Sequence, residues 1–118
     1  MNIDQWLDEL KRAWEQHDID AAVALFSDDV EYWESPFERV IPEKLHDLWQ
    51  DVHGCVSTHV DCEVYSQQDN RYAVVWHATW KDLQGEPQER GGTYLVTLDD
   101  TGKCNYFYRT SMSKEAQS

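Results

Sequence analysis

Positive charge is scarce in this chain. Its 118 residues include ten lysines and arginines against 23 aspartates and glutamates, which gives a formal net charge of -13. A surface of this sign repels phosphate backbones and anionic lipid head groups. We therefore expect neither nucleic acid nor a membrane surface as a partner.

Long apolar runs are also absent. The first residues, MNIDQWLDELKR, carry acids where a secretory signal needs a basic region followed by an apolar one. No later stretch approaches the length of a membrane span. The expected location is the cytoplasm.

Cysteines and cofactor motifs are few. Cys55, Cys62 and Cys104 are odd in number and show no C-x-x-C spacing, so neither a disulfide framework nor a thiolate zinc site is indicated. His59 and Asp61 form one H-x-D pair, too sparse a ligand set to predict a metal. The chain lacks a P-loop, a glycine-rich dinucleotide fingerprint and a G-x-S-x-G elbow. We expect no metal and no cofactor.

Aromatic residues, in contrast, are abundant. They make up 13% of the chain, with six tryptophans and six tyrosines, and supply large side chains for a core. The length is that of one domain. We assign residues 1–112 to this domain and residues 113–118 to a polar C-terminal tail.

The first half of the chain has a helical period. Apolar residues recur every three or four positions over residues 3–14, which predicts an amphipathic helix. Asp18 is a suitable N-cap for a second, shorter helix whose apolar side extends to Phe26. A third helix is predicted from Pro42, at its first position, to a stop at Gly54.

After residue 55 the period changes to two. Four strands rich in β-branched and aromatic residues are predicted at residues 56–66, 72–81, 92–98 and 104–112. Turn signals separate them, so they should pair in hairpin order. This order predicts an α+β fold in which three N-terminal helices pack on a curved antiparallel sheet.

Two stretches carry a resemblance to a known superfamily. They are 17-HDIDAAVALFSDDVEYWESPFE-38 and 94-YLVTLDDTGKCNYF-107. With the order of elements, they resemble the nuclear transport factor 2-like superfamily and its SnoaL-like branch. The resemblance implies a cone-shaped α+β barrel with a cavity open at one end. It leaves function open, since the superfamily includes isomerases, dehydratases, cyclases and transport adaptors.

The resemblance also allows a comparison with ketosteroid isomerase. Matching the turns puts Ser35 at the position of the carboxylate base, Leu10 at that of the helix tyrosine and Tyr94 at that of the second acid. Serine cannot remove a proton from carbon unaided, and leucine cannot donate to an oxyanion. Glu34 is one residue away, and adjacent strand residues point to opposite faces. The isomerase mechanism therefore does not transfer to this chain.

His77 and Tyr94 form the candidate catalytic pair. Strand parity and the hairpin alignment place His77 on one inward face with Tyr94, Phe107 and Arg109. A histidine can exchange protons at neutral pH, and a tyrosine hydroxyl can orient a developing oxyanion. The alternative is that His77 is a core or outer-face histidine.

Six further residues are candidates for ligand binding: Trp33, Ser35, Phe37, Trp49, Phe107 and Arg109. The rings of Trp33 and Phe37 should edge the cavity while the neighbouring acids stay at its rim; a simple hairpin is the alternative for residues 30–41. The rings either line the cavity or fill it. Arg109 either grips a ligand carboxylate or pairs with Glu34 or Glu31.

The other face of the sheet is predicted to be aromatic. Parity assigns to it Tyr106, Tyr108 and Thr110, alongside Tyr72, Trp76 and Trp80. Such a face is too apolar to remain exposed to water, and it suits a homodimer interface.

Two functional hypotheses follow. The first is a conical pocket for a small apolar or aromatic molecule, with cofactor-free lyase, isomerase or cyclase activity. The second is a ligand carrier or protein-interaction module of the same fold without catalysis.

Overall fold

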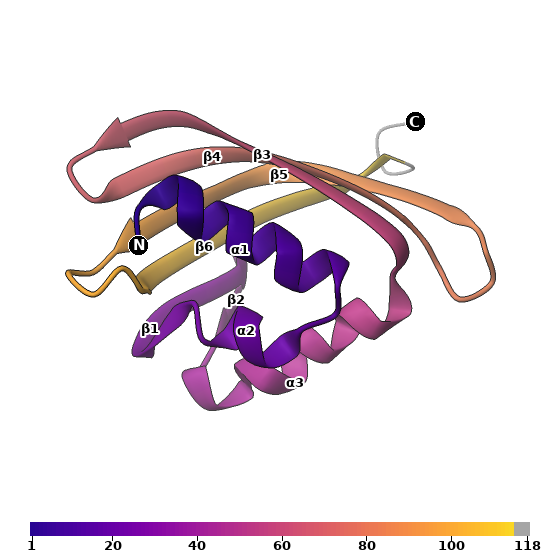
Figure 1. The fold of residues 1–118 in the computed structure, drawn as a ribbon, viewed down its shortest axis with the longest axis horizontal. Helices are drawn as coiled ribbons and strands as arrows, with labels where there is room; N and C mark the ends of the chain where they lie inside the picture. Colours follow the sequence, from indigo (N-terminus) through magenta and orange to yellow (C-terminus); the bar gives the residue numbers. More distant parts are fainter. Residues whose placement is uncertain (115–118) are drawn as a thin grey trace.

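A computed structural model describes residues 1–114. Helices occupy the first half of the chain and long strands the second, as the two periods predict (Figure 1). The helical elements are α1 (Ile3–Glu15), α2 (Ile19–Val23), the 3-10 turn η1 (Pro42–Lys44), α3 (Leu45–Trp49) and the 3-10 turn η2 (Gln50–Gly54). The strands are β1 (Phe26–Ser35), β2 (Glu38–Val40), β3 (Val56–Gln68), β4 (Arg71–Lys81), β5 (Pro87–Leu98) and β6 (Cys104–Ser113).

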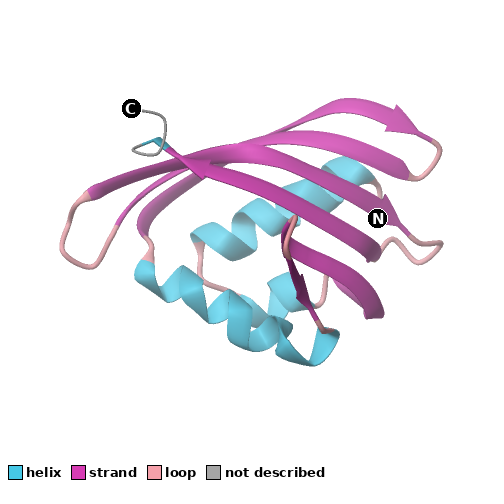
Figure 2. Cartoon of the chain, turned by 180° about the vertical axis from the view of Figure 1, so that it is seen from behind, coloured by secondary structure: helices cyan, strands magenta, loops and turns pink. Residues whose placement is uncertain are grey.

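The six strands form one sheet in the order β2-β1-β6-β5-β4-β3. The strands from β3 to β6 pair as antiparallel hairpins, whereas β1 lies parallel to β6. The sheet curves around the helices, which gather on one of its faces (Figure 2). The predicted α+β fold of three helices on a curved sheet is confirmed, with one parallel pair in an otherwise antiparallel sheet.

The first helix contributes its apolar side chains to the core between the helices and the sheet. Asn2 caps α1, since its side chain accepts a hydrogen bond from the backbone N–H of Gln5 at 2.9 Å and the Gln5 side chain accepts one from the backbone N–H of Asn2 at 3.0 Å. Its apolar stripe is buried, with Trp6 at 0% and Leu10 at 1% exposure. The Trp6 indole donates to the carbonyl of Leu25 at 3.0 Å. Burying a side chain such as Leu10 contributes roughly 1.5–3 kcal/mol.

The second helix is shorter than the period predicts. It ends at Val23, and Phe26 begins β1 instead of completing the apolar side of the helix. Phe26 lies opposite Cys104 of β6 in the parallel register, and its ring meets Trp6 edge-on with centroids 5.7 Å apart. Packing against α1 and β6 therefore outweighs the local helical pattern.

Most other predicted boundaries agree with the structure within two residues, but β5 begins at Pro87, five residues before the predicted start at residue 92. The third helical segment runs from Pro42 to Gly54 through η1, α3 and η2. Residues 30–41 form the β1–β2 hairpin and the start of the next connection, which was the plainer of the two interpretations. β6 extends to Ser113, one residue into the predicted tail, and residues 115–118 of that tail lie outside the described part of the chain.

No helix within residues 1–114 is long and apolar enough to cross a membrane.

Gly92 provides a test of how closely β5 and β6 approach. A Cβ atom at Gly92 would overlap the backbone carbonyl of Thr110 in β6. We expect Gly92→Ala to force the strands apart and to lower the free energy of unfolding by roughly 1–3 kcal/mol. Gly54→Ala is the matched control, because nothing lies within 4 Å of its added Cβ. Urea unfolding measures both variants, and equal midpoints would contradict the expectation.

Candidate active site

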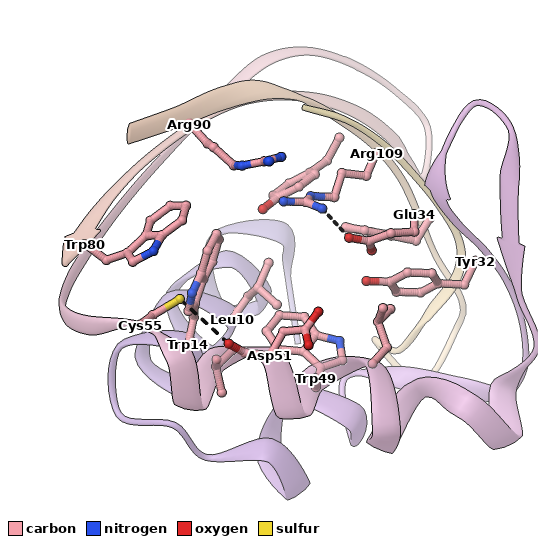
Figure 3. Close-up of a pocket in the computed structure, with 14 residues that line it drawn as sticks. Leu10, Trp14, Tyr32, Glu34, Trp49, Asp51, Cys55, Trp80, Arg90 and Arg109 are labelled. Atoms are coloured by element: carbon pink, nitrogen blue, oxygen red, sulfur yellow. Dashed lines mark hydrogen bonds and ion pairs between the residues drawn. The ribbon is translucent and has the colours of Figure 1, made fainter. Parts of the chain in front are cut away.

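A cavity of about 290 Å³ lies between the helices and the inner face of the sheet (Figure 3). This volume is near the lower end of the range for small-molecule pockets. Most of its walls are apolar or aromatic side chains, with charged groups at a few points. The lining residues are Leu10, Trp14, Tyr32, Glu34, Leu48, Trp49, Asp51, Val52, Cys55, Trp80, Arg90, Tyr94, Phe107 and Arg109.

An ion pair between Glu34 and Arg109 forms the polar centre of the cavity. Nη1 of Arg109 donates to Oε1 of Glu34, which joins β6 to the neighbouring strand β1. The Arg109 guanidinium also lies over the ring of Trp76, 4.9 Å from its centroid. Burial raises the pKa of Glu34, and the positive charge of Arg109 opposes this shift without cancelling it.

Two tyrosines border this ion pair. Tyr94 is stacked on Trp76 with ring centroids 5.3 Å apart, and Tyr32 is stacked on Phe107 at 4.9 Å. Both tyrosines are 2% exposed. Burial raises the pKa of both hydroxyl groups. They therefore remain protonated at neutral pH and are able to donate hydrogen bonds.

Tryptophans form the opposite part of the wall. The ring of Trp14 on α1 contacts Trp49 on α3 and Trp80 on β4, with centroids 6.4 and 6.3 Å away. Nε1 of Trp49 is buried and has no hydrogen-bond partner among residues 1–114. Cys55 donates weakly to the carbonyl of Asp51, at 3.9 Å, and burial raises the pKa of its thiol. The flat rings of the three tryptophans suit a ring-shaped ligand.

The arrangement is suited to proton transfer. A carboxyl group with a raised pKa accepts or releases a proton closer to neutral pH than an exposed glutamate does. Arg109 and the two tyrosine hydroxyls are donors that can stabilise negative charge on a ligand oxygen. The cavity thus combines an acid–base group with candidate oxyanion donors.

Four of the residues predicted from the sequence line this cavity: Tyr94, Trp49, Phe107 and Arg109. Of the two internal partners considered for Arg109, the structure shows Glu34. The cavity is open and not filled by its own rings.

His77 does not meet Tyr94. In the β4–β5 register Tyr94 lies opposite Val74, so the inward face of β4 carries Val74 and Trp76, and His77 points to the other side. The His77 side chain is 48% exposed, and its Nε2 lies 2.6 Å from Oε2 of Glu89. The predicted placement of this pair on one face is wrong, and the alternative of an outer-face histidine holds.

The inward-facing residues of β4 lie one position away from those predicted, so the other predicted side chains of this strand also change face. Trp76 is 1% exposed and packs in the core, and Trp80 lines the cavity, so neither belongs to the outer face as predicted. Tyr72 lies opposite Val96, whose side chain is also buried. The parity predicted for β5 and β6 agrees with the structure, whereas that of β4 is inverted.

Trp33, Ser35 and Phe37 do not line the cavity. Trp33 lies opposite Tyr108, on the face away from the cavity, and its indole donates to Oε2 of Glu31 at 2.8 Å. Phe37 is 96% exposed at the hairpin turn, and Ser35 accepts a hydrogen bond from its backbone N–H at 3.2 Å. The predicted aromatic rim is therefore wrong, because the alternation in β1 turns Trp33 outward and Phe37 lies in the turn beyond the end of the strand.

Sequence reasoning missed Glu34 and Tyr32 as cavity residues. The signal was present in the alternation of β1, where Val30 and Tyr32 are the apolar members of one face and Glu34 continues it. Weighting that face would have pointed to Glu34 instead of Ser35.

Metal ligands are not gathered in the described part of the chain. No group of three or more histidine, cysteine, aspartate or glutamate side chains there is placed to hold an ion. His59 and Asp61 contact each other on β3, with Nε2 3.1 Å from Oδ2.

The curved sheet, the helices on its inner face and the cavity between them define the nuclear transport factor 2-like class of α+β proteins. A family model for the SnoaL-like domain matches residues 5–105. The chain therefore belongs to the SnoaL-like family, as its two signature stretches indicated. No curated protein matches the sequence.

Solved structures share this fold over nearly the whole chain. A proposed polyketide cyclase from Pseudomonas putida KT2440 is 18% identical, covers 92% of this chain and 90% of its own, and has a TM-score of 0.75. A Mycobacterium tuberculosis protein in complex with estradiol-17beta-hemisuccinate is 17% identical, with coverages of 87% and 88% and a TM-score of 0.71. The epoxide hydrolase/cyclase-like enzyme SalBIII has a role in pyran ring formation in the polyether salinomycin. It is 15% identical, covers 93% of this chain and 88% of its own, and has a TM-score of 0.74. At these identities the similarity establishes the fold.

The Glu34–Arg109 pair allows a direct electrostatic test. Arg109→Met keeps much of the apolar stem against Trp76 but removes the positive charge that favours the ionised form of Glu34. We expect the pKa of Glu34, already raised by burial, to rise further in this variant. Carboxyl carbon shifts of Glu34, followed by NMR against pH, measure it. Arg39→Met, at an exposed position on β2, is the control, and an unchanged or lower titration midpoint in Arg109→Met would contradict the assignment.

Proposed function

We propose that this protein binds a small, mainly apolar or aromatic molecule in the cavity and acts on it as a cofactor-free lyase, isomerase or cyclase. The observation that carries the proposal is a half-buried carboxyl of raised pKa, Glu34, beside the hydroxyl-bearing Tyr94 inside an aromatic-walled cavity. Support for a ring-shaped ligand comes from the flat walls of Trp14, Trp49 and Trp80. The estradiol ester held by the Mycobacterium tuberculosis relative has the same general character.

The proposed chemistry assigns one role to each polar group. Glu34 takes a proton from a carbon or oxygen of the ligand, or returns it. Arg109 and Tyr94 donate hydrogen bonds to the oxygen on which negative charge develops. Tyr94 suits this role because its raised pKa keeps its proton in place. His77, on the outer face, has no part in this scheme.

A carrier without catalysis is the second candidate. It is favoured by the fact that Arg109 already has two partners, the carboxylate of Glu34 and the ring of Trp76. A polar centre that is satisfied internally can serve to hold the fold together while the aromatic walls bind the ligand.

Deuterium exchange of 2-tetralone in D₂O distinguishes the two candidates. This bicyclic ketone has acidic carbon-bound protons, so a positioned base should accelerate their exchange, which proton NMR follows. We expect Glu34→Gln to lose the acceleration by roughly 10²–10⁴-fold, the usual contribution of a general base, while the compound still quenches tryptophan fluorescence. Arg39→Gln is the control and should exchange as the native protein does.

Each outcome of this experiment decides between the candidates. Acceleration that depends on Glu34 supports the enzyme. Binding of 2-tetralone with no acceleration by the native protein supports the carrier. Absence of both binding and acceleration contradicts the proposal as a whole.

We also propose that two copies of the chain associate through the outer face of the sheet. A row of apolar side chains crosses four neighbouring strands in register: Ala73, Leu95, Tyr108 and Trp33. Leu95 is 44% exposed, as is nearby Val75. Apolar rows of this length on an exposed sheet are typical of interaction surfaces. Tyr106 and Tyr108 thus keep the role predicted for them, and Leu95 takes the place of the inward-facing tryptophans.

Leu95→Glu tests this interface. A charge in the centre of the apolar row must be desolvated on association, so we expect the assembly to dissociate into 13.9 kDa monomers. Leu83→Glu is the matched control, because Leu83 is 71% exposed in the β4–β5 turn and lies outside the row. Sedimentation equilibrium measures the mass, and a native protein that is already monomeric would refute the dimer.

The proposed location is the cytoplasm. All three cysteines are free, which supports a reducing compartment.

A further inference from the structure

We propose that Arg90 makes the cavity selective for ring compounds that carry a carboxylate, an inference that rests on the ligand binding proposed above. The specificity group would be the guanidinium at the outer part of the cavity wall, distinct from the deeper pair of Glu34 and Arg109.

The position of Arg90 follows from the register of the sheet. It lies on β5 opposite the fully buried Ala78 of β4, and therefore on the face that carries Tyr94. Nη1 of Arg90 donates to Oγ of Ser111 at 2.9 Å. Ser111 follows Arg109 by two residues in β6, so the two guanidinium groups lie along one wall of the cavity (Figure 3).

The two arginines differ in how their charges are balanced. Arg109 has the carboxylate of Glu34 and the ring of Trp76, and its side chain is 17% exposed. Arg90 is exposed, and no carboxylate among residues 1–114 forms an ion pair with it. Of its five N–H donors, one is used by Ser111. Within residues 1–114 the remaining donors are therefore available to a ligand in the cavity.

Other charges around the cavity set the orientation of an acid. Figure 3 shows Asp51 on the far side of the cavity from Arg90. Glu34, deeper on the wall, repels a second negative charge whenever it is ionised. A ring compound with one carboxylate therefore fits in one direction, with its ring between the tryptophans and its carboxylate on Arg90. The planar guanidinium can bind both carboxylate oxygens at once.

Lysine and arginine are scarce in this chain, so two arginines at one cavity are a distinctive feature. Only ten of the 118 residues are lysine or arginine, and two of them line this one cavity. The net charge of -13 disfavours anions at long range, but salt screens that repulsion over about 10 Å. A contact with Arg90 at hydrogen-bond distance is screened much less.

Matched pairs of an acid and its neutral amide test the inference. We would titrate benzoate against benzamide, and 2-naphthoate against 2-naphthamide, into the native protein by isothermal calorimetry at pH 7. The expected preference for the acid is roughly two- to fivefold, the range for an ion pair with an exposed side chain. Arg90→Gln should abolish this preference while leaving the affinity for the amide largely unchanged. Arg90→Lys keeps the positive charge but lacks the planar guanidinium, so this variant should retain part of the preference for the acid. Arg39→Gln, an exposed arginine on β2, should bind as the native protein does.

The outcomes separate this inference from the proposed function. If acid and amide bind the native protein equally well, or if the preference survives in Arg90→Gln, the inference is wrong and the ligand-binding cavity stands. If neither member of either pair binds, the ligand-binding proposal fails and the inference fails with it. A preference that is lost in Arg90→Gln, reduced in Arg90→Lys and intact in Arg39→Gln confirms it.

Discussion

The packing of Trp76 is the interaction on which the cavity depends. This indole, 1% exposed, donates to the carbonyl of Thr110 at 3.1 Å and so ties β4 to β6 across β5. Tyr94 stacks on it with an interplanar angle of 7°, and the ring of Trp14 approaches it from α1 at 5.9 Å. The guanidinium of Arg109 lies over it. Trp76 therefore positions α1, the Tyr94 ring and the Arg109 guanidinium, which together form the wall of the cavity.

The half-buried ion pair is the second constraint. Taking Glu34 and Arg109 out of water costs free energy, and their attraction offsets this cost only when the geometry is good and further partners are present. Here the contact with Trp76 and partial exposure of both side chains reduce the cost. The balance remains unfavourable enough to raise the pKa of Glu34. The same burial that opposes the charge thus makes this carboxyl a better proton carrier than an exposed glutamate.

The two faces of the sheet carry different sets of side chains because adjacent residues of a strand point to opposite faces. Tyr94, Phe107 and Arg109 line the cavity, whereas their neighbours Leu95 and Tyr108 extend the apolar row on the outside. The proposed ligand site and the proposed interaction surface can therefore change independently by substitution at alternate positions. Arg90 adds to the inner face a charge that the ion pair does not neutralise.

The elements that were predicted well are those whose pattern is local. The apolar stripe of α1, the N-terminal proline of the third helical segment and the turn residues between β3, β4, β5 and β6 each specify their structure within a few residues. The second helix was predicted too long because Phe26 fits a helical period equally well. Its place in β1 is decided by Trp6 and Cys104, which are distant in the sequence.

The sequence by itself therefore determined the family, the order of elements and the pool of aromatic residues. Which face of β1 and β4 turns inward was decided by the tertiary structure. A strand pattern with large side chains on both faces, such as Val75-Trp76-His77 or Trp33-Glu34, fits either orientation, and a shift of one residue exchanges them. Pairing of β4 with β5 and of β1 with β6 removed this ambiguity. It buried Trp76, turned Glu34 into the cavity and left His77 and Trp33 outside it.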